Sequence, residues 1–396
     1  RSGGAMGAYL SAPVTEKDER GGWAGPGPGG RPALLYGASA MQGWRRSMED
    51  AHLTVEALPE GAEETALFAV FDGHGGQEVA KFCEKHFCEE LARELAAEKQ
   101  GGSARPTLGP AMVRSFHRMD EMIAGGEYMH EILGLQEGAS PREGPSKGPA
   151  GADAPAGRAS EEGAQAQDDA TVMKLNLLRD LMERSRISEP GQRPPGAPPV
   201  CTLPEHDVQA GCTAVVACLQ GRHLVVGWAG DSRAVICRGG KAHALSVDHK
   251  PADIRERTRI EKAGGFVQEM NGHHRVNGNL NLSRAIGDLK YKGDRSIEPK
   301  DQVITAEPDI TEWELSDDDE FMVLACDGVW DVMSNQEVVD FVRQRVHGLG
   351  GDEEAKSAKL SKVASEMLDA CLAADPKLTR GIGGDNMTAI IISLKH

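Results

Sequence analysis

Acidic residues follow or flank short apolar runs at four separated places in this sequence, each beside a small turn-forming residue. The places are Met48-Glu49-Asp50-Ala51, Phe71-Asp72-Gly73-His74-Gly75-Gly76, Cys326-Asp327-Gly328-Val329-Trp330-Asp331 and Gly384-Asp385-Asn386-Met387-Thr388. Hard divalent cations such as Mg²⁺ and Mn²⁺ prefer several oxygen ligands, and two adjacent ions need a carboxylate that can bridge them. A single Asp-Gly is ordinarily only a turn. The repeated pattern, however, favours a metal-dependent hydrolase.

Two of these carboxylates are expected at the ends of strands. The apolar runs 67–71 and 321–326 are too short for helices and are typical of strands buried on both faces. Asp72 and Asp327 follow these runs directly. The glycine after each aspartate permits a sharp turn and brings a backbone carbonyl close to whatever the carboxylate binds. The carbonyl of Gly73 is therefore a further candidate ligand.

The remaining periodicity indicates how these strands are covered. Residues 77–97 carry apolar side chains at helical spacing, and residues 111–123 are predicted to form the partner helix. Residues 213–219 and 222–229 predict a hairpin, and a second turn leads into a strand over 233–237. Alternating hairpins and helix pairs indicate an α+β domain in which sheet packs on sheet with helices outside.

Composition divides the chain into a folded domain and two polar segments. Residues 1–33 are predicted to be an expression scar followed by a flexible N-terminal segment, and residues 34–396 the folded domain. An insertion at about 124–206 is rich in Gly, Pro, Ala, Ser and Glu, so it cannot bury enough apolar surface to offset its ordering entropy. Within it, residues 169–187 carry an apolar stripe that predicts one helix, either docked on the domain or binding a partner.

Charge and cysteine usage exclude several classes of protein. The net charge of −17 argues against nucleic-acid binding, and therefore against a two-metal nuclease, because such proteins need basic stripes. Eight cysteines lie in apolar settings without a Cys-x-x-Cys pair, which predicts reduced packing residues and not a zinc site. No apolar stretch approaches the roughly 20 residues of a membrane span, and no secretory signal is recognisable. We therefore expect a cytoplasmic protein, and a monomer.

The N-terminal sequence carries one lipidation motif. After five residues that resemble an expression scar, Met6-Gly7-Ala8-Tyr9-Leu10-Ser11 fits N-myristoylation at Gly7, with an ordinary flexible terminus as the alternative. One myristoyl chain gives only weak, reversible membrane contact. The neighbouring sequence offers no cysteine or basic cluster as a second anchor.

A longer series of motifs resembles one known family, the PPM class of metal-dependent Ser/Thr protein phosphatases, also called type 2C phosphatases. The resemblance covers about residues 34–122 and 207–394, in the family's order. Its motifs are Gly43-Trp44-Arg45, Met48-Glu49-Asp50-Ala51, Val70-Phe71-Asp72-Gly73-His74-Gly75-Gly76, Gly211-Cys212-Thr213-Ala214, Ala229-Gly230-Asp231-Ser232-Arg233, Asp248-His249-Lys250-Pro251, Arg275-Val276-Asn277-Gly278, Ser283-Arg284-Ala285-Ile286-Gly287-Asp288, Cys326-Asp327-Gly328-Val329-Trp330-Asp331 and Gly384-Asp385-Asn386.

This resemblance implies a fold and an activity. The fold is a four-layer α-β-β-α sandwich of two mainly antiparallel sheets with flanking helix pairs. The activity is hydrolysis of phosphoserine and phosphothreonine in proteins, a signalling reaction, by attack of a water activated by two metal ions. The alternative is a pseudophosphatase that binds phosphoproteins without turnover, but that class usually lacks ligand carboxylates that this sequence retains.

The resemblance also assigns the metal ligands. Asp72 would bridge two Mg²⁺ or Mn²⁺ ions, and Asp327 and Asp385 would complete one of them. The carbonyl of Gly73 and, through water, the side chain of Glu49 would hold the other.

Three further aspartates have supporting roles by the same resemblance. Asp50 would orient metal-bound water. Asp231 and Asp331 would join Asp327 around a loosely held third ion. For Asp331 the alternative is a surface position on the first turn of a helix after Trp330, where a carboxylate favours the helix dipole.

Two basic residues complete the predicted chemistry. Arg45 is expected to bind the phosphate because a guanidinium group matches phosphate oxygens with two parallel hydrogen bonds, and Arg46 is the alternative. His74 would protonate the leaving oxygen, which is also the family's assignment. Cys212 departs from the family, which usually has Ser or Thr there. Because a thiol is a weak hydrogen bonder, we expect looser local geometry before Thr213.

Residues 246–290 correspond to the family's variable flap beside the active site. Four basic residues in it are expected either to steer phosphopeptides or to form an ordinary solvated helix face. They are Arg255, Arg257, Arg259 and Lys262.

Overall fold

The computed structural model describes residues 9–24, 34–59, 65–100, 107–136, 208–270, 272–346 and 350–394. The chain divides into two compact units, residues 1–140 with 203–396, and residues 141–202. All described residues belong to the first unit. The helix predicted over residues 169–187 lies outside the described residues and stays a prediction.

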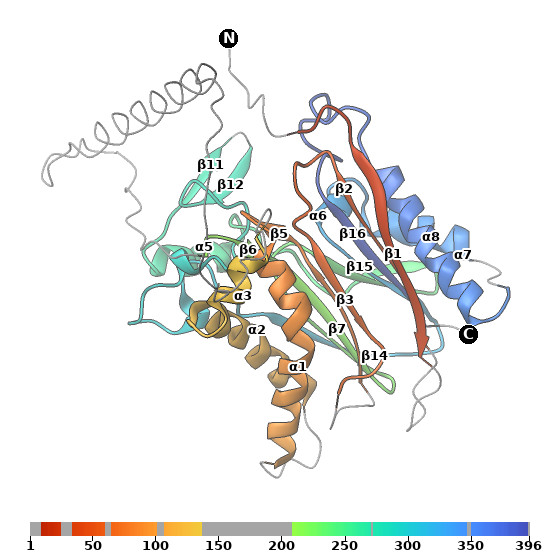
Figure 1. The fold of residues 1–396 in the computed structure, drawn as a ribbon, viewed down its shortest axis with the longest axis horizontal. Coiled ribbons are helices and arrows are strands. Elements are labelled where there is room, and N and C mark those ends of the chain that lie inside the picture. The colour runs from red at the N-terminus through yellow and green to blue at the C-terminus, as the bar shows by residue number, and fades with distance from the viewer. Residues whose placement is uncertain are drawn as a thin grey trace, which may run out of the picture. The chain divides into compact units, whose positions relative to one another are not determined.

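Two antiparallel sheets form the centre of the first unit (Figure 1). The six-stranded sheet has the order β1 (Val14–Ala24), β2 (Leu34–Gly43), β16 (Met387–Ser393), β15 (Asp319–Ala325), β9 (Arg233–Arg238), β10 (Lys241–Ala244). The five-stranded sheet has the order β14 (Asp309–Glu314), β8 (His223–Ala229), β7 (Ala214–Gln220), β4 (Thr65–Phe71), β3 (Ala51–Val55). The predicted hairpin is confirmed as β7 and β8, which pair from Ala214 with Ala229 to Gln220 with His223.

Strand alternation sends side chains into three buried layers. In β4, Phe68 and Val70 face the layer between the sheets, whereas Leu67 and Phe71 face the helices on the other side. The rings of Tyr36 and Phe68 meet in the middle layer with centroids 5.4 Å apart. These strands read as unbroken apolar runs because both of their faces are covered.

Helices cover the two outer faces. Helices α1 (Glu78–Gln100) and α2 (Leu108–Ala124) pack on the five-stranded sheet, and α3 (Met129–Gly134) packs against α1. Helices α7 (Asn335–Val346) and α8 (Glu353–Cys371) pack on the six-stranded sheet. The predicted four-layer sandwich is therefore confirmed, as are the helices predicted over 77–97 and 111–123. No described helix combines the length and the apolar character needed to span a membrane.

Short elements cluster at one end of the sandwich. A small sheet has the order β13 (Ile286–Gly287), β6 (Gly211–Cys212), β5 (Gly73–His74). The flap segment contains α5 (Ile254–Lys262), the hairpin of β11 (Val267–Met270) and β12 (His273–Val276), and the 3₁₀ turns η2 (Leu289–Tyr291) and η3 (Pro299–Asp301). Helix α6 (Asp327–Trp330) begins two residues after β15.

The prediction of a flexible N-terminal segment is wrong for residues 14–24. These residues form β1, the edge strand that pairs antiparallel with β2. Helix α8 secures the strand, because Ser361 Oγ donates a hydrogen bond to the Arg20 carbonyl (2.7 Å) and Lys17 pairs with Asp369 (2.6 Å). Charged residues are common on edge strands, where they discourage pairing with other chains. Because β1 carries such residues, its sequence lacks the apolar pattern that predicts a strand.

The predicted start of the insertion at 124 is also too early. The chain continues through α3, in which Ile132 is fully buried, and Tyr128 packs on Phe82 with centroids 5.5 Å apart. The side chain of Gln77 donates to the carbonyl of Leu135 (2.9 Å). At 6 residues, this helix is too short for periodicity to reveal it.

Helix α8 approaches β2 so closely at Gly37 that no side chain fits there. A Cβ atom on Gly37 would lie 2.0 Å from the backbone nitrogen of Ser361. Gly37→Ala should therefore destabilise the domain by about 1–3 kcal/mol, as overpacking does, measured by urea unfolding. Gly126→Ala is the control, because a Cβ there meets nothing within 4 Å. Equal stability of the two variants would contradict this packing.

Candidate active site

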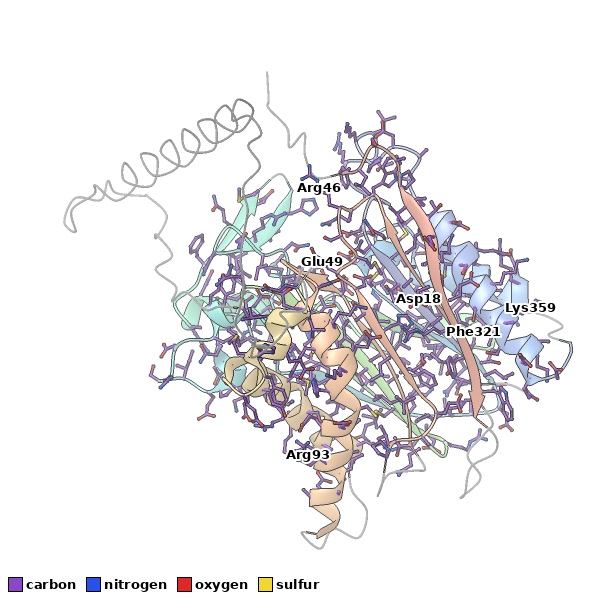
Figure 2. All side chains as sticks on the ribbon, viewed as in Figure 1. Asp18, Arg46, Glu49, Arg93, Phe321 and Lys359 are labelled. Carbon is purple, nitrogen blue, oxygen red and sulfur yellow. The ribbon has the colours of Figure 1, made fainter. Side chains whose placement is uncertain are left out.

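A cavity of about 390 Å³ opens where the two sheets end beside the flap. Most of the predicted site residues line it. They are Arg45, Glu49, Asp72, Gly73, His74, Asp231, Asp327 and Asp385, with Arg46, Thr213, Asn386, Arg275 and residues 279–282 completing the wall. Asp50 is buried, and Asp331 is exposed outside the lining residues. Figure 2 shows Glu49 on the side where α1 and the small sheet begin.

Three aspartates converge at the floor of this cavity. One carboxylate oxygen from each of Asp72, Asp231 and Asp327 lies within 4.8 Å of the others. Asp72 follows β4, Asp231 follows β8 and Asp327 begins α6, so both sheets contribute. Burial, followed by repulsion from neighbouring carboxylates, raises the pKa of Asp72 and of Asp327 well above the usual range. Such a group needs protons or a cation between its members.

Asp50 lies deeper, and one of its oxygens has no partner. Its Oδ2 accepts a hydrogen bond from Thr388 Oγ1 (2.7 Å), whereas Oδ1 is buried without a hydrogen bond among the described residues. Burial, opposed by the Thr388 hydrogen bond and reinforced by Asp385, raises the pKa of Asp50 to about 7. An orphaned buried carboxylate oxygen fits a site that takes up a further polar group, such as a bound water.

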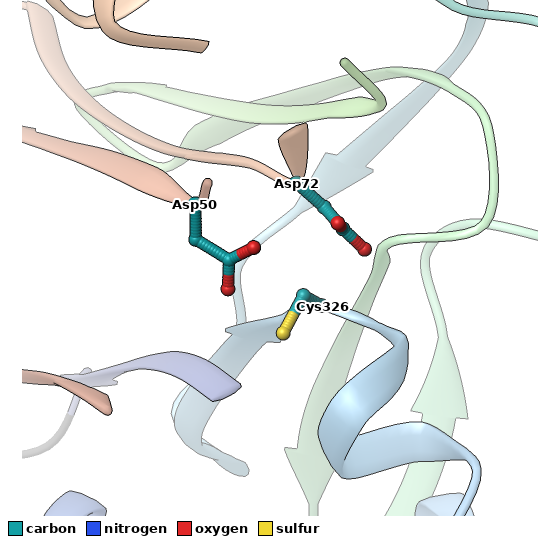
Figure 3. Close-up of side chains that lie close together, drawn as sticks. All are labelled: Asp50, Asp72 and Cys326. Atoms are coloured by element: carbon teal, nitrogen blue, oxygen red, sulfur yellow. The ribbon is translucent and has the colours of Figure 1, made fainter. Parts of the chain in front are cut away.

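Asp50, Asp72 and Cys326 form a second group, in which one ligand atom of each residue lies within 4.8 Å of the others (Figure 3). The Cys326 thiol does not fit a role as ligand, because burial and the surrounding carboxylates raise its pKa well above the usual range. Its sulfur instead accepts a hydrogen bond from the Thr388 backbone nitrogen (3.1 Å). The oxygen-rich donor set therefore fits Mg²⁺ or Mn²⁺ better than a thiophilic metal.

Backbone contacts hold Glu49 next to Gly73. A Cβ on Gly73 would lie 2.2 Å from the Glu49 carbonyl oxygen, so only glycine fits at this position. The Glu49 side chain accepts hydrogen bonds from Ser47 Oγ (2.8 Å) and from the Gly76 backbone nitrogen (3.2 Å). The Glu49 backbone nitrogen donates to Asn386 Oδ1 (2.9 Å). Glu49 is thus fixed at the edge of the aspartate group without belonging to it.

Arg45 stands at the mouth of the cavity and pairs with Asp385, with Nη2 and Oδ2 2.5 Å apart. About half of the Arg45 side chain is exposed. Although burial opposes it, the Asp385 carboxylate raises the pKa of Arg45, so the guanidinium stays charged. Arg46 also lines the cavity, and its side chain is exposed.

His74 has a buried carboxylate partner that the sequence did not indicate. Its Nε2 lies 2.6 Å from Oδ2 of Asp288, whose side chain is 2% exposed. Burial opposes protonation, but the Asp288 charge raises the pKa of His74. Asp288 adopts a left-handed backbone conformation (φ 51°), which is unusual for a residue other than glycine and is found at functional sites. Since Nε2 is bound to Asp288, Nδ1 is the nitrogen left for a substrate.

The two aspartates predicted to hold a third ion with Asp327 lie in different surroundings. Asp231 belongs to the aspartate group but also pairs with Lys250 (2.5 Å). Asp331 lies at the C-terminal end of α6, not on the first turn of a helix, so the predicted favourable helix dipole is wrong.

The flap arginines do not form a free basic surface. Arg255 pairs with Asp309 (2.5 Å), Arg257 with Glu261 (2.8 Å) and Arg259 with Glu256 (2.5 Å). Their charges are therefore largely taken up by ion pairs within the domain. The solvated-helix alternative describes Arg255 and Arg257, whereas the Arg259 side chain is only 11% exposed and donates to the carbonyls of Gln302 (3.1 Å) and Ser283 (2.5 Å).

Cys212 is fully buried beside the backbone that leads to Thr213. Its sulfur lies 3.9 Å from that of Cys83 in α1, and the neighbouring Thr213 backbone nitrogen donates to the Asp72 carbonyl (2.9 Å). The backbone therefore anchors Asp72 without help from a hydroxyl at position 212, and the looser geometry expected from the thiol stays a prediction.

Four residues that shape the site were missed from the sequence. Asp288 and Lys250 stood in recognised motifs but carried no assigned role. Thr388 and Asn386 follow Asp385, and Asn386 also donates to the carbonyls of Gln42 (2.8 Å) and Ser47 (2.9 Å). Only the polar character of these residues beside predicted ligands could have drawn attention to them.

Comparison with known proteins gives one consistent result. The family model described as "Protein phosphatase 2C" matches residues 34–140 and 165–377. The chain is 41% identical over 390 residues to "Probable protein phosphatase 2C 11" of Oryza sativa subsp. japonica, an alignment that covers 98% of this chain and 91% of that protein. It is 34% identical to "Protein phosphatase 1G" of Mus musculus, covering 98% of this chain and 93% of that protein.

Solved structures share the fold. A phosphatase from a pathogenic strain of Toxoplasma gondii matches with a TM-score of 0.56 and 23% identity, covering 96% of each chain. A serine-threonine phosphatase 2C from Toxoplasma gondii matches with a TM-score of 0.57 and 19% identity, covering 95% of this chain and 99% of that one.

Acid should weaken the binding of divalent ions, because Asp50, Asp72 and Asp327 must lose protons before they can face a cation. We expect the affinity for Mn²⁺ to rise at least roughly tenfold between about pH 5.5 and about pH 7.5, with protons released on binding. Calorimetric titration in two buffers of different ionisation enthalpy measures both quantities. An affinity that does not change with pH, or binding without proton release, would contradict the raised pKa values.

Proposed function

The chain belongs to the protein phosphatase 2C family, and on that premise we propose how its residues divide the reaction. It is a metal-dependent protein serine/threonine phosphatase whose substrates are phosphorylated proteins. The observation that supports the proposal most strongly is the convergence of Asp72, Asp231 and Asp327 in one cavity with Arg45 and His74. A pseudophosphatase is not favoured, because the predicted ligand carboxylates are all present.

We propose that the site takes two ions, either Mg²⁺ or Mn²⁺. Asp72 would bridge them, Asp327 and Asp385 would complete one, and the Gly73 carbonyl and Glu49, through water, would hold the other. When bound, the ions would supply a water activated as nucleophile and positive charge around the phosphate.

The buried Asp50 is proposed to orient the attacking water. Its Oδ2 is held by Thr388, and its Oδ1 is free of hydrogen bonds among the described residues and can accept one. The side chain cannot swing away, because it lies in the packed interior at 2% exposure.

A third, weakly held ion is proposed between Asp327, Asp231 and Asp331. Two features support weak affinity. Lys250 already pairs with Asp231, so a cation must compete with an ammonium group, and Asp331 is exposed to water.

Arg45 and His74 are proposed to act on the substrate. Arg45 would turn its guanidinium from Asp385 to the phosphate oxygens, with Arg46 as the alternative. His74, held at Nε2 by Asp288, would donate a proton to the leaving oxygen from Nδ1. Asp288 acts through His74 and is a positioning residue.

We further propose a cytoplasmic monomer with a role in signalling, and myristoylation at Gly7 that gives weak, reversible membrane contact. Gly7 lies outside the described residues. The support is the sequence motif alone, and the mass of protein made with its N-terminus at Gly7 in the presence of an N-myristoyltransferase tests it.

Removal of a bridging or terminal carboxylate should abolish turnover without unfolding the protein. Asp72→Asn or Asp327→Asn is expected to lower kcat on p-nitrophenyl phosphate by roughly a thousandfold or more with Mn²⁺ or Mg²⁺. Their thermal stability in chelator should equal or exceed that of wild type, because each removes a repelling charge. Asp317→Asn, at an exposed aspartate, is the matched control. Full wild-type activity in excess chelator would sink the assignment.

Loss of the general acid His74 should lower the rate of hydrolysis most for substrates with poor leaving groups. His74→Gln is expected to slow phosphoserine peptides roughly a hundredfold or more but p-nitrophenyl phosphate far less, since that leaving group needs little protonation. Asp288→Asn should show the same selectivity with smaller losses. His117→Gln is the control, because His117 pairs with Glu307 and does not line the cavity. Equal losses on both substrates would remove His74 as the acid.

A further inference from the structure

The loop between α8 and β16 presents an unusual surface. We define the 375–384 loop as residues 375–384. Leu378 at its tip is 83% exposed, the highest value among the exposed large hydrophobic residues of the described chain, and Ile382 is 51% exposed. Single exposed aliphatic residues are common on protein surfaces. Two of them on one loop of ten residues form a small apolar surface.

Two cations accompany these aliphatic side chains. Lys377 and Arg380 are exposed, and neither has an ion-pair partner within 4 Å among the described residues. This contrasts with the paired flap arginines. The loop also contains Asp375, whose Oδ1 accepts a hydrogen bond from the Lys377 backbone nitrogen (2.9 Å), so its two cations and one carboxylate give a net charge of +1 in a protein of net charge −17. Charges beyond about 10 Å are largely screened from the loop at physiological salt.

The loop is held in one shape by its own hydrogen bonds. The backbone nitrogen of Gly381 donates to the Pro376 carbonyl (2.7 Å), that of Ala373 to Gly383 (2.8 Å), and Thr379 Oγ1 donates to the Ile382 carbonyl (2.5 Å). Arg380 takes a left-handed conformation with φ 58°. A loop that collapsed freely would bury Leu378 and Ile382, so their exposure is built into its backbone.

The N-terminal segment lies against the same loop. Tyr9 packs on it, because a Cβ on Gly381 or on Gly384 would lie 3.1 Å from the Tyr9 ring or hydroxyl. The Leu10 backbone nitrogen donates to the Trp44 carbonyl (2.9 Å). In Figure 1 the blue loop after α8 lies beside the N-terminal end of β1.

We propose that the 375–384 loop binds the surface of an anionic membrane, with Leu378 and Ile382 between the lipid headgroups and Lys377 and Arg380 on the anionic ones. Aliphatic side chains flanked by cations suit that interface. The loop does not line the active-site cavity, whereas ligand-binding sites are usually concave. The proposed membrane binding by the loop does not depend on acylation of Gly7, and acylation would increase the affinity for the membrane.

Vesicle binding tests the proposal. Protein that begins at Gly7, with and without a myristoyl group confirmed by mass, is sedimented with phosphatidylcholine vesicles containing about 30% phosphatidylserine or none. Lys377→Gln/Arg380→Gln should lower partition onto anionic vesicles roughly thirtyfold and abolish the preference for them. Lys241→Gln/Lys300→Gln changes the net charge equally and should bind like wild type. Equal losses in both double variants, or no loss in either, would overturn the proposal.

A fluorescent probe tests insertion directly and does not need acylation. The protein has five tryptophans, so each variant is compared with the unsubstituted protein. Leu378→Trp should add emission that is shifted to the blue and quenched by brominated lipid on anionic vesicles, whereas the emission added by Ile254→Trp, at a similarly exposed site (77%) on the flap, should not be quenched. No quenching at position 378 in either form of the protein would contradict membrane contact. If Leu378→Ser/Ile382→Ser left vesicle binding unchanged but raised KM for a phosphoprotein, the loop would be a substrate-docking surface instead. If Gly7 is not acylated, only the proposal of myristoylation is refuted, and the proposal that the 375–384 loop binds membranes is unaffected.

Discussion

Mutual repulsion among buried carboxylates is the constraint around which this domain is arranged. Asp72, Asp231 and Asp327 bring oxygens within 4.8 Å of one another, and Asp50 lies beside Asp72 in the interior. Removing such charges from water and placing them together is unfavourable unless protons or cations stand between them. The raised pKa values of Asp50, Asp72 and Asp327 express that cost in the metal-free protein. Metal ions would turn the same arrangement into a stabilising one.

The two sheets supply the rigidity that holds these groups against their repulsion. Asp72 follows β4 and Asp327 follows β15, strands whose faces are covered by the packed layers on both sides. Neutral or backbone donors then fix individual groups: Thr388 holds Asp50, Gly76 and Ser47 hold Glu49, and the Thr213 nitrogen holds the Asp72 carbonyl. Apart from Lys250, the protein places few cations on the group. Positive charge is thereby left for a metal to provide.

The sequence predicted those parts of the molecule whose signals are local. Buried strands, amphipathic helices and Asp-Gly turns can each be recognised from a few consecutive residues. The order of motifs indicated the layered fold. Partners that meet only in three dimensions were missed. Asp288 reaches His74 across β6, and nothing near either residue in the sequence announces the pair. Strand β1 was missed because its charged residues are those of an edge strand, and the helix containing Ile132 because it is only six residues long.

We propose that Asp72 would bridge metal ions in the cavity beside the flap. Anomalous diffraction from crystals grown with Mn²⁺ tests it most directly, because the signal locates manganese independently of any assumed ligand. We expect two strong peaks sharing Asp72 as a ligand, one also bound by Asp327 and Asp385 and the other by the Gly73 carbonyl. Manganese bound elsewhere, or a cavity without anomalous signal at Asp72 under conditions that support turnover, would contradict this account.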